Sequence, residues 1–126
     1  MSREELPKAL ATWYDYTKWV LDRVDGFPKN HRFVLGTRLA DAVVDVMELL
    51  AEAAYARGLA KADLLDRANR RIESVRWLVR IVKDRNVISA RQFAFSAKAL
   101  EECGRMVGGW LKQSRARSAT SGNEAA

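Results

Sequence analysis

Three basic side chains on one predicted helix offer the clearest chemistry in this sequence. Arg76, Arg80 and Lys83 are spaced four and three residues apart, so they lie on one helical face. Arginine suits phosphate recognition because its planar guanidinium can donate two parallel hydrogen bonds to phosphate oxygens. Arg70 and Arg71 extend this basic surface toward the start of the same helix. The pattern is typical of a phosphate-binding surface and equally of a solvated face balanced by nearby carboxylates.

The signals that accompany sequence-specific base recognition are missing. The sequence contains no zinc-finger spacing, no aromatic ribonucleoprotein motif and no helix-turn-helix pattern. Any nucleic-acid binding is therefore expected to involve the phosphate backbone and to weaken steeply with salt.

Residues that could perform catalysis are scarce. His31 and Cys103 are the only histidine and cysteine, so they can form neither an internal disulfide nor a zinc site. We expect His31 at a helix start or on the surface, and Cys103 in the core. No phosphate-binding loop, dinucleotide fingerprint or nucleophile elbow is present. The sequence predicts no catalytic residue, no metal and no cofactor, and thus a protein that is not an enzyme.

Composition and charge indicate one globular domain. The chain has 126 residues, of which 48% are hydrophobic and 30% charged, in the range of folded soluble domains. The net charge is +6, and residues 59–126 hold 14 basic and 7 acidic residues. This excess favours a polyanionic partner. No secretory signal or membrane span is visible, so we expect a cytoplasmic protein with no membrane partner.

Four amphipathic segments must position these charges, at about residues 7–24, 30–57, 61–85 and 89–112. Asn30 and Ser89 suit helix starts, with Gln92 completing a capping box, and Gly58 suits a helix end. Short connections predict an all-α, antiparallel up-down-up-down four-helix bundle over residues 1–113. The composition of residues 114–126 predicts a disordered tail.

Apolar spacing predicts the core face of each amphipathic segment. The first segment presents Leu6, Leu10, Trp13, Thr17, Val20 and Val24. The third presents Leu64, Ala68, Ile72, Val75, Val79 and Val82, and the fourth presents Phe93, Ala97, Leu100, Gly104, Val107 and Leu111.

Two features suggest an oligomer interface. Trp77 and Ile81 lie off the core stripe of the third segment, which indicates a second buried surface. The second segment carries one acidic stripe, formed by Asp41, Asp45, Glu48 and Glu52. This acidic stripe is either solvated or meets the basic flank of a neighbouring copy, with Trp77 and Ile81 as anchors. Such a contact joins unlike surfaces and can close into a ring.

Four stretches resemble one known four-helix-bundle family. They are Phe27-Pro28-Lys29 with Arg32, Leu35-Gly36 and Arg38-Leu39; the run 75–80 (Val-Arg-Trp-Leu-Val-Arg); Ile88-Ser89 with Phe93; and the run 104–112 (Gly-Arg-Met-Val-Gly-Gly-Trp-Leu-Lys). That family contains the accessory variability determinants (Avd) of diversity-generating retroelements and proteins encoded in 23S rRNA intervening sequences. The resemblance covers roughly residues 6–112.

The resemblance implies a homopentamer with a basic surface that associates with a reverse transcriptase, with template-repeat RNA and with its complementary DNA. It implies that Arg76 and Arg80 match basic positions of the third helix, and Arg105 and Lys112 those of the fourth. With Lys83, Arg70 and Arg71 added from the charge pattern, these are the predicted nucleic-acid-binding residues. The alternative is a protein-binding scaffold whose basic face recognises an acidic partner.

Overall fold

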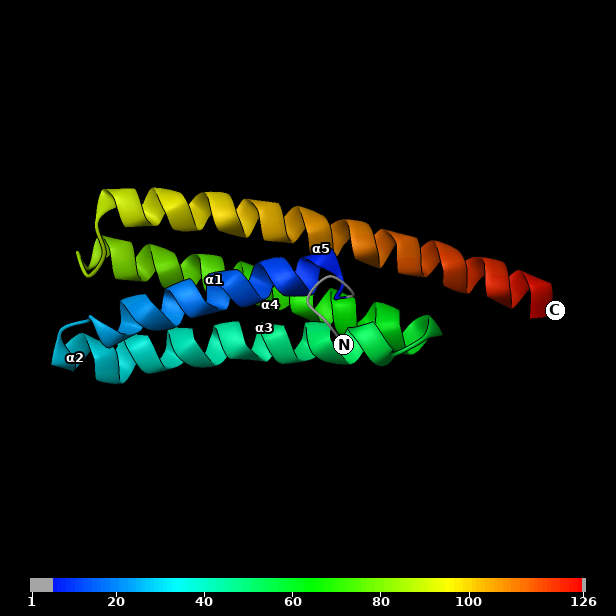
Figure 1. The fold of residues 1–126 in the computed structure, drawn as a ribbon, viewed down its shortest axis with the longest axis horizontal. Coiled ribbons are helices and arrows are strands. Elements are labelled where there is room, and N and C mark those ends of the chain that lie inside the picture. The colour runs from blue at the N-terminus through cyan, green and yellow to red at the C-terminus, as the bar shows by residue number, and fades with distance from the viewer. Residues whose placement is uncertain (1–5, 126) are drawn as a thin grey trace.

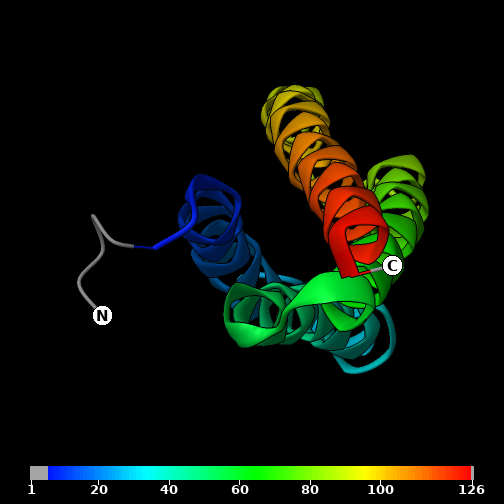
Figure 2. The same cartoon turned by 90° about the vertical axis from the view of Figure 1, so that its right-hand side faces the viewer.

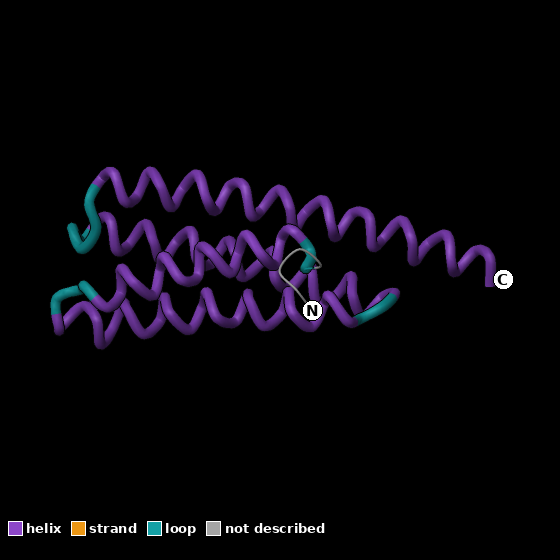
Figure 3. Tube along the Cα trace, viewed as in Figure 1, coloured by secondary structure: helices purple, strands orange, loops and turns teal. Residues whose placement is uncertain are grey.

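The computed structural model describes residues 6–125, with side chains described through residue 119. Its long helices are α1 (Lys8–Asp25), α3 (Thr37–Tyr55), α4 (Gly58–Asp84) and α5 (Ala90–Ala125), and they alternate in direction (Figure 1). The short helix α2 (Lys29–His31) and a π-helical turn (Arg32–Gly36) lead directly into α3. Only helices and connecting loops occur in the described part of the chain (Figure 3). The predicted four-helix bundle is confirmed.

The four long helices form two layers when the bundle is viewed along its length (Figure 2). Helix α1 packs against α3 and α5, and α4 packs against the same two helices. Helices α1 and α4 are therefore diagonal partners. As a result, α4 lies between two grooves, one shared with α3 and one shared with α5.

The helix boundaries follow local sequence signals. Pro7 precedes the first turn of α1, where its missing N–H costs no hydrogen bond. At the start of α5, the backbone N–H of Gln92 donates to Ser89 Oγ, and the backbone N–H of Ser89 donates to Gln92 Oε1. Both distances are 3.0 Å. These reciprocal bonds confirm the predicted capping box.

The connection between α3 and α4 differs from the prediction. Helix α3 ends at Tyr55 instead of Arg57, and α4 begins at Gly58. Gly58 has a φ of +59°, a left-handed conformation that glycine adopts without steric cost. Gly58 therefore opens α4 after an extended Ala56-Arg57 pair, instead of closing the preceding helix.

The predicted core face of α1 is confirmed. Leu10, Trp13, Thr17, Val20 and Val24 are buried, and Leu6 packs against the core while partly exposed. The Trp13 indole N–H donates to the Val43 carbonyl oxygen at 2.8 Å, which ties α1 to α3.

Tyr16 was not predicted to be buried, yet it links α1 to α5. Its hydroxyl lies 2.6 Å from Ser96 Oγ. Desolvation raises the pKa of the Tyr16 phenol well above its ordinary range, so the hydroxyl stays protonated and available for this bond.

The predicted core faces of α4 and α5 need correction. On α4, Leu65 is fully buried and Leu64 only partly, while the other predicted positions are buried. On α5, Leu100, Val107 and Leu111 are buried as predicted, but Ala97 is exposed and Phe93 and Gly104 are partly exposed. Ser96 and Cys103 take their places. The buried stripe of α5 thus keeps three of its predicted positions and otherwise runs through Ser96, which hydrogen-bonds the Tyr16 hydroxyl, and Cys103.

Helix α5 also continues beyond residue 113, where the sequence predicted a disordered tail, and it projects past the rest of the bundle (Figure 1). Ser114 continues the buried stripe one turn after Leu111, and Arg115 lies 3.7 Å from Asp66 of α4. The predicted boundary at residue 113 therefore falls within α5, and the disorder of the tail stays a prediction. Residues 1–5 of the predicted bundle and residue 126 of the predicted tail lie outside the described residues.

No helix in the described part of the chain is both long enough and apolar enough to cross a membrane.

Candidate nucleic-acid interface

The seven predicted nucleic-acid-binding residues occupy three different parts of the surface. Arg70 and Arg71 line the groove between α3 and α4. Arg76 and Arg80 line the groove between α4 and α5, and Lys83 lies over the Phe93 ring at 5.8 Å on the same side. Arg105 and Lys112 are exposed on α5 and share a face, because they are two helical turns apart. The structure therefore does not gather the seven residues into one patch.

Several of these basic side chains already contact a carboxylate. Arg70 Nη2 lies 2.9 Å from Asp66 Oδ2, and Arg80 Nε lies 3.3 Å from Asp84 Oδ2. Arg67, one turn before Arg70, lies 4.0 Å from Asp63. Such exposed pairs contribute about 0–1 kcal/mol each. A phosphate can displace them, but it must compete with the resident carboxylate.

Arg76 joins α4 to α5. Its Nη2 donates to the Leu100 carbonyl oxygen at 3.3 Å. Its Nε lies 3.0 Å from Glu73 Oε1, without the alignment of a hydrogen bond. The Gly104 backbone faces this guanidinium, since a Cβ there would lie 3.0 Å from Arg76 Nη2. Arg76 thus packs against α5 through its charged end, and only part of its side chain remains exposed.

Trp77 and Ile81, the predicted interface anchors, are exposed on α4. Their exposed fractions are 69% and 44%, and Trp77 borders the α4–α5 groove beside Phe93 and Ala97. Large apolar side chains this exposed favour a partner surface. Their role at an oligomer interface stays a prediction.

The acidic stripe faces basic residues of its own chain. Asp45, Glu48 and Glu52 line the α3–α4 groove opposite three arginines of α4, namely Arg67, Arg70 and Arg71. No ion pair joins the two sides among the described residues, and Asp41 is exposed. The acidic stripe therefore has an intrachain basic counterpart that the sequence reading did not predict.

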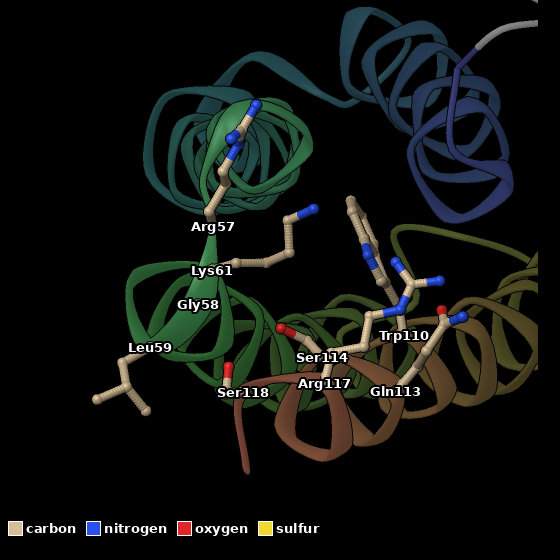
Figure 4. Close-up of a pocket in the computed structure, with 9 residues that line it drawn as sticks. All are labelled: Arg57, Gly58, Leu59, Lys61, Trp110, Gln113, Ser114, Arg117 and Ser118. Carbon is tan, nitrogen blue, oxygen red and sulfur yellow. The ribbon is translucent and has the colours of Figure 1, made fainter. Parts of the chain in front are cut away.

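Sequence reasoning missed a second basic cluster, at the turn between α3 and α4. Arg57 and Lys61 flank Gly58, and Arg117 approaches from α5 (Figure 4). Lys61 Nζ lies 5.8 Å from the centre of the Trp110 ring. Arg117 lies in the stretch that was predicted to be a disordered tail, and the structure places it on α5, one turn after the buried Ser114.

Cys103 and His31 are the remaining candidate side chains. Cys103 is buried as predicted, and desolvation, with a smaller contribution from Glu102, raises its thiol pKa from 9.0 to about 12. The thiol is therefore protonated near neutral pH. His31 ends α2, near the helix start where we expected it. Within residues 6–125, no three His, Cys, Asp or Glu side chains gather closely enough to hold a metal ion.

Comparison with known families gives one match. A model of the bAvd-like family matches residues 9–114, from α1 into α5. No curated protein and no solved structure matches the chain. The match includes all seven predicted nucleic-acid-binding residues and confirms the family resemblance. With most of its length matched, the chain belongs to the bAvd-like family.

Proposed function

We propose that this chain is a non-catalytic, nucleic-acid-binding accessory protein that associates with a reverse transcriptase and template RNA in a diversity-generating retroelement. In this role it supports mutagenic reverse transcription. The observation that carries the proposal is the bAvd-like match over residues 9–114. The exposed side chains of Arg71, Arg105 and Lys112, which form no ion pair among the described residues, support phosphate binding.

The accessory protein acts as a homopentamer in this proposal. Exposed Trp77 and Ile81 supply apolar anchors, and five copies would multiply individually weak phosphate contacts through effective concentration. Light scattering behind a sizing column tests this directly. We expect five times the chain mass of 14.2 kDa for the wild type, and a smaller particle for Trp77→Glu. A wild-type monomer or dimer contradicts the pentamer.

RNA binding is tested on the outer face of α5. Replacing Arg105 and Lys112 with glutamine removes two exposed charges at low structural risk. For single-stranded RNA, the slope of log affinity against log salt should fall by about 1.4 if both contact phosphates. The matched control replaces the exposed Lys8 and Lys29 with glutamine, an equal change in net charge. Equal losses in both variants would argue against this face.

Co-purification with the reverse transcriptase that this proposal requires tests the whole assignment. We expect the polymerase and the template RNA to be retained together on the tagged wild-type chain. Failure to retain the polymerase contradicts the proposal. Retention of an acidic protein with no RNA would instead support the protein-binding scaffold.

A further inference from the structure

The α3–α4 turn and α5 line an open cavity of about 290 Å³. Arg57 precedes α4, Lys61 lies in its first turn, and Arg117 comes from α5 nearly sixty residues later in the chain. Figure 4 shows Lys61 and Ser114 extending into the space between the helices, with Arg117 beside Trp110. The lining residues are Arg57, Gly58, Leu59, Lys61, Trp110, Gln113, Ser114, Arg117 and Ser118.

The positive charge of this cavity is not neutralised by the chain. Its lining includes no carboxylate, and none of its three cationic side chains forms an ion pair with a described residue. The acidic residues of the following turns are engaged elsewhere: Asp63 contacts Arg67, and Asp66 contacts both Arg70 and Arg115. An anion beside Lys61 and Arg117 would therefore meet no competing carboxylate in the lining, while Arg57 extends away from these two side chains (Figure 4).

The cavity also offers hydrogen-bond donors that lack partners. Helix α4 begins here with no side-chain cap and no acidic residue in its first turn, so its first amide groups have no intrahelical acceptor. Independently, Ser118 Oγ lines the cavity, is buried, and has no hydrogen-bond partner among the described residues. A buried hydroxyl without a partner carries a free-energy cost that a bound acceptor would remove.

The arrangement of these donors suits a phosphate group. Guanidinium, ammonium, hydroxyl and backbone N–H groups reach the cavity from two helices, and a tetrahedral phosphate presents acceptor oxygens in several directions. The Trp110 ring beside Lys61 Nζ helps to hold the ammonium over the cavity.

We propose that this cavity is a phosphate-binding site, formed by Lys61, Arg57, Arg117 and Ser118 around the start of α4. The phosphate comes either from a free polyphosphate anion or from a nucleic-acid strand. This inference does not depend on the proposed retroelement function, since Arg117 and Ser118 lie beyond the residues matched by the family.

The test measures binding of inorganic pyrophosphate to the full chain by titration calorimetry at low ionic strength. In the pocket variant, Lys61→Gln with Arg117→Gln, we expect affinity to fall about tenfold or more, because two charge-assisted hydrogen bonds are lost. The matched control, Arg91→Gln with Lys98→Gln, removes two exposed α5 charges outside the cavity and should stay within about twofold of the wild type. The single variant Ser118→Ala should lose about threefold in affinity for pyrophosphate, with thermal stability kept or slightly raised because an unpartnered buried hydroxyl is removed.

Strand probes identify the source of the phosphate. Single-stranded oligonucleotides with a 5′-phosphate or a 5′-hydroxyl are titrated against the wild type and the pocket variant. If the pocket variant loses affinity only for the 5′-phosphorylated strand, the site binds a terminal phosphate. If it loses affinity equally for both strands, the site binds a backbone phosphate. If it loses affinity for pyrophosphate alone, the site binds a free anion.

Unchanged pyrophosphate affinity in the pocket variant overturns the site, as does an equal loss in the matched control. Loss of pyrophosphate binding with intact RNA binding would support the site while leaving the proposed accessory function untouched. The two proposals can therefore fail separately.

Discussion

Arg70 and Arg80 on α4 each contact a carboxylate one turn away, whereas Lys61 and Arg117 at the α3–α4 turn contact none among the described residues. Both regions are basic, yet most arginines of α4 are paired and only Arg71 among them forms no ion pair with a described residue. The difference arises from spacing, because acids at i±3 or i±4 lie beside a helical arginine and pair with it. Residue type and helical face therefore do not suffice to identify a phosphate site; the neighbouring acids must be counted as well.

Replacing Arg76 gives the largest expected effect. It tests whether an arginine of α4 that is already engaged stabilises the fold instead of binding RNA. Arg76→Met removes the hydrogen bond to the Leu100 carbonyl and the contact with Glu73, so the free energy of unfolding should fall by about 2 kcal/mol. RNA affinity should change by less than about twofold, since this guanidinium is already engaged. Urea unfolding followed by circular dichroism measures the first effect.

Arg80→Met is the control for Arg76, because Arg80 pairs only with the exposed Asp84. Its unfolding free energy should change by no more than about 0.5 kcal/mol. If Arg76→Met kept full stability and lost most RNA affinity, Arg76 would belong to the nucleic-acid site and the comparison would fail.

Removing a carboxylate that pairs with arginines should make their charge available, as the charges of Lys61 and Arg117 already are. Asp66 contacts both Arg70 and Arg115, so Asp66→Asn frees two guanidinium groups at once. The salt slope for single-stranded RNA should then rise by up to about 1.4, with affinity rising about three- to tenfold at low salt. Asp22→Asn makes the same change in net charge on α1 and should have little effect. A similar gain in both variants would attribute the effect to net charge alone.

Two glycines of α5 give the smallest expected effect. A Cβ on Gly108 meets nothing within 4 Å, so Gly108→Ala should stabilise the bundle by about 0.5–1 kcal/mol through helix propensity. A Cβ on Gly104 would lie 3.0 Å from Arg76 Nη2, so Gly104→Ala should gain little or nothing. Thermal unfolding compares them. An equal gain in stability at both positions would show that Arg76 moves aside freely and does not tie α4 to α5.

Local signals explain how much of the fold was predictable. Periodic apolar residues predicted each long helix, and the Ser89–Gln92 box marked the start of α5, because both depend on interactions within one helical turn. The same spacing rule could have identified Arg70 and Arg80 as paired. Apolar spacing predicted the core face of α1 well, since five regularly spaced residues there are buried.

The full buried stripe of α5 and its length were not predictable in this way. Apolar spacing places a helix face only to within about one residue, and Ala97 and Gly104 fit the pattern as well as Ser96 and Cys103 do. The choice depends on Tyr16 of α1, whose buried hydroxyl needs Ser96. Contacts between α5 and α4 likewise continue the helix beyond residue 113.

By itself, the sequence determined an all-helical bundle, its approximate helix ends, the absence of a histidine–cysteine metal site and a family membership over residues 9–114. Only the tertiary structure decided which of the free charges lie close together. It placed Arg117 beside Lys61 and set the acidic stripe opposite the α4 arginines of the same chain. The physical reason is that helical periodicity acts over one turn, whereas the pairing of distant charges depends on how whole helices pack.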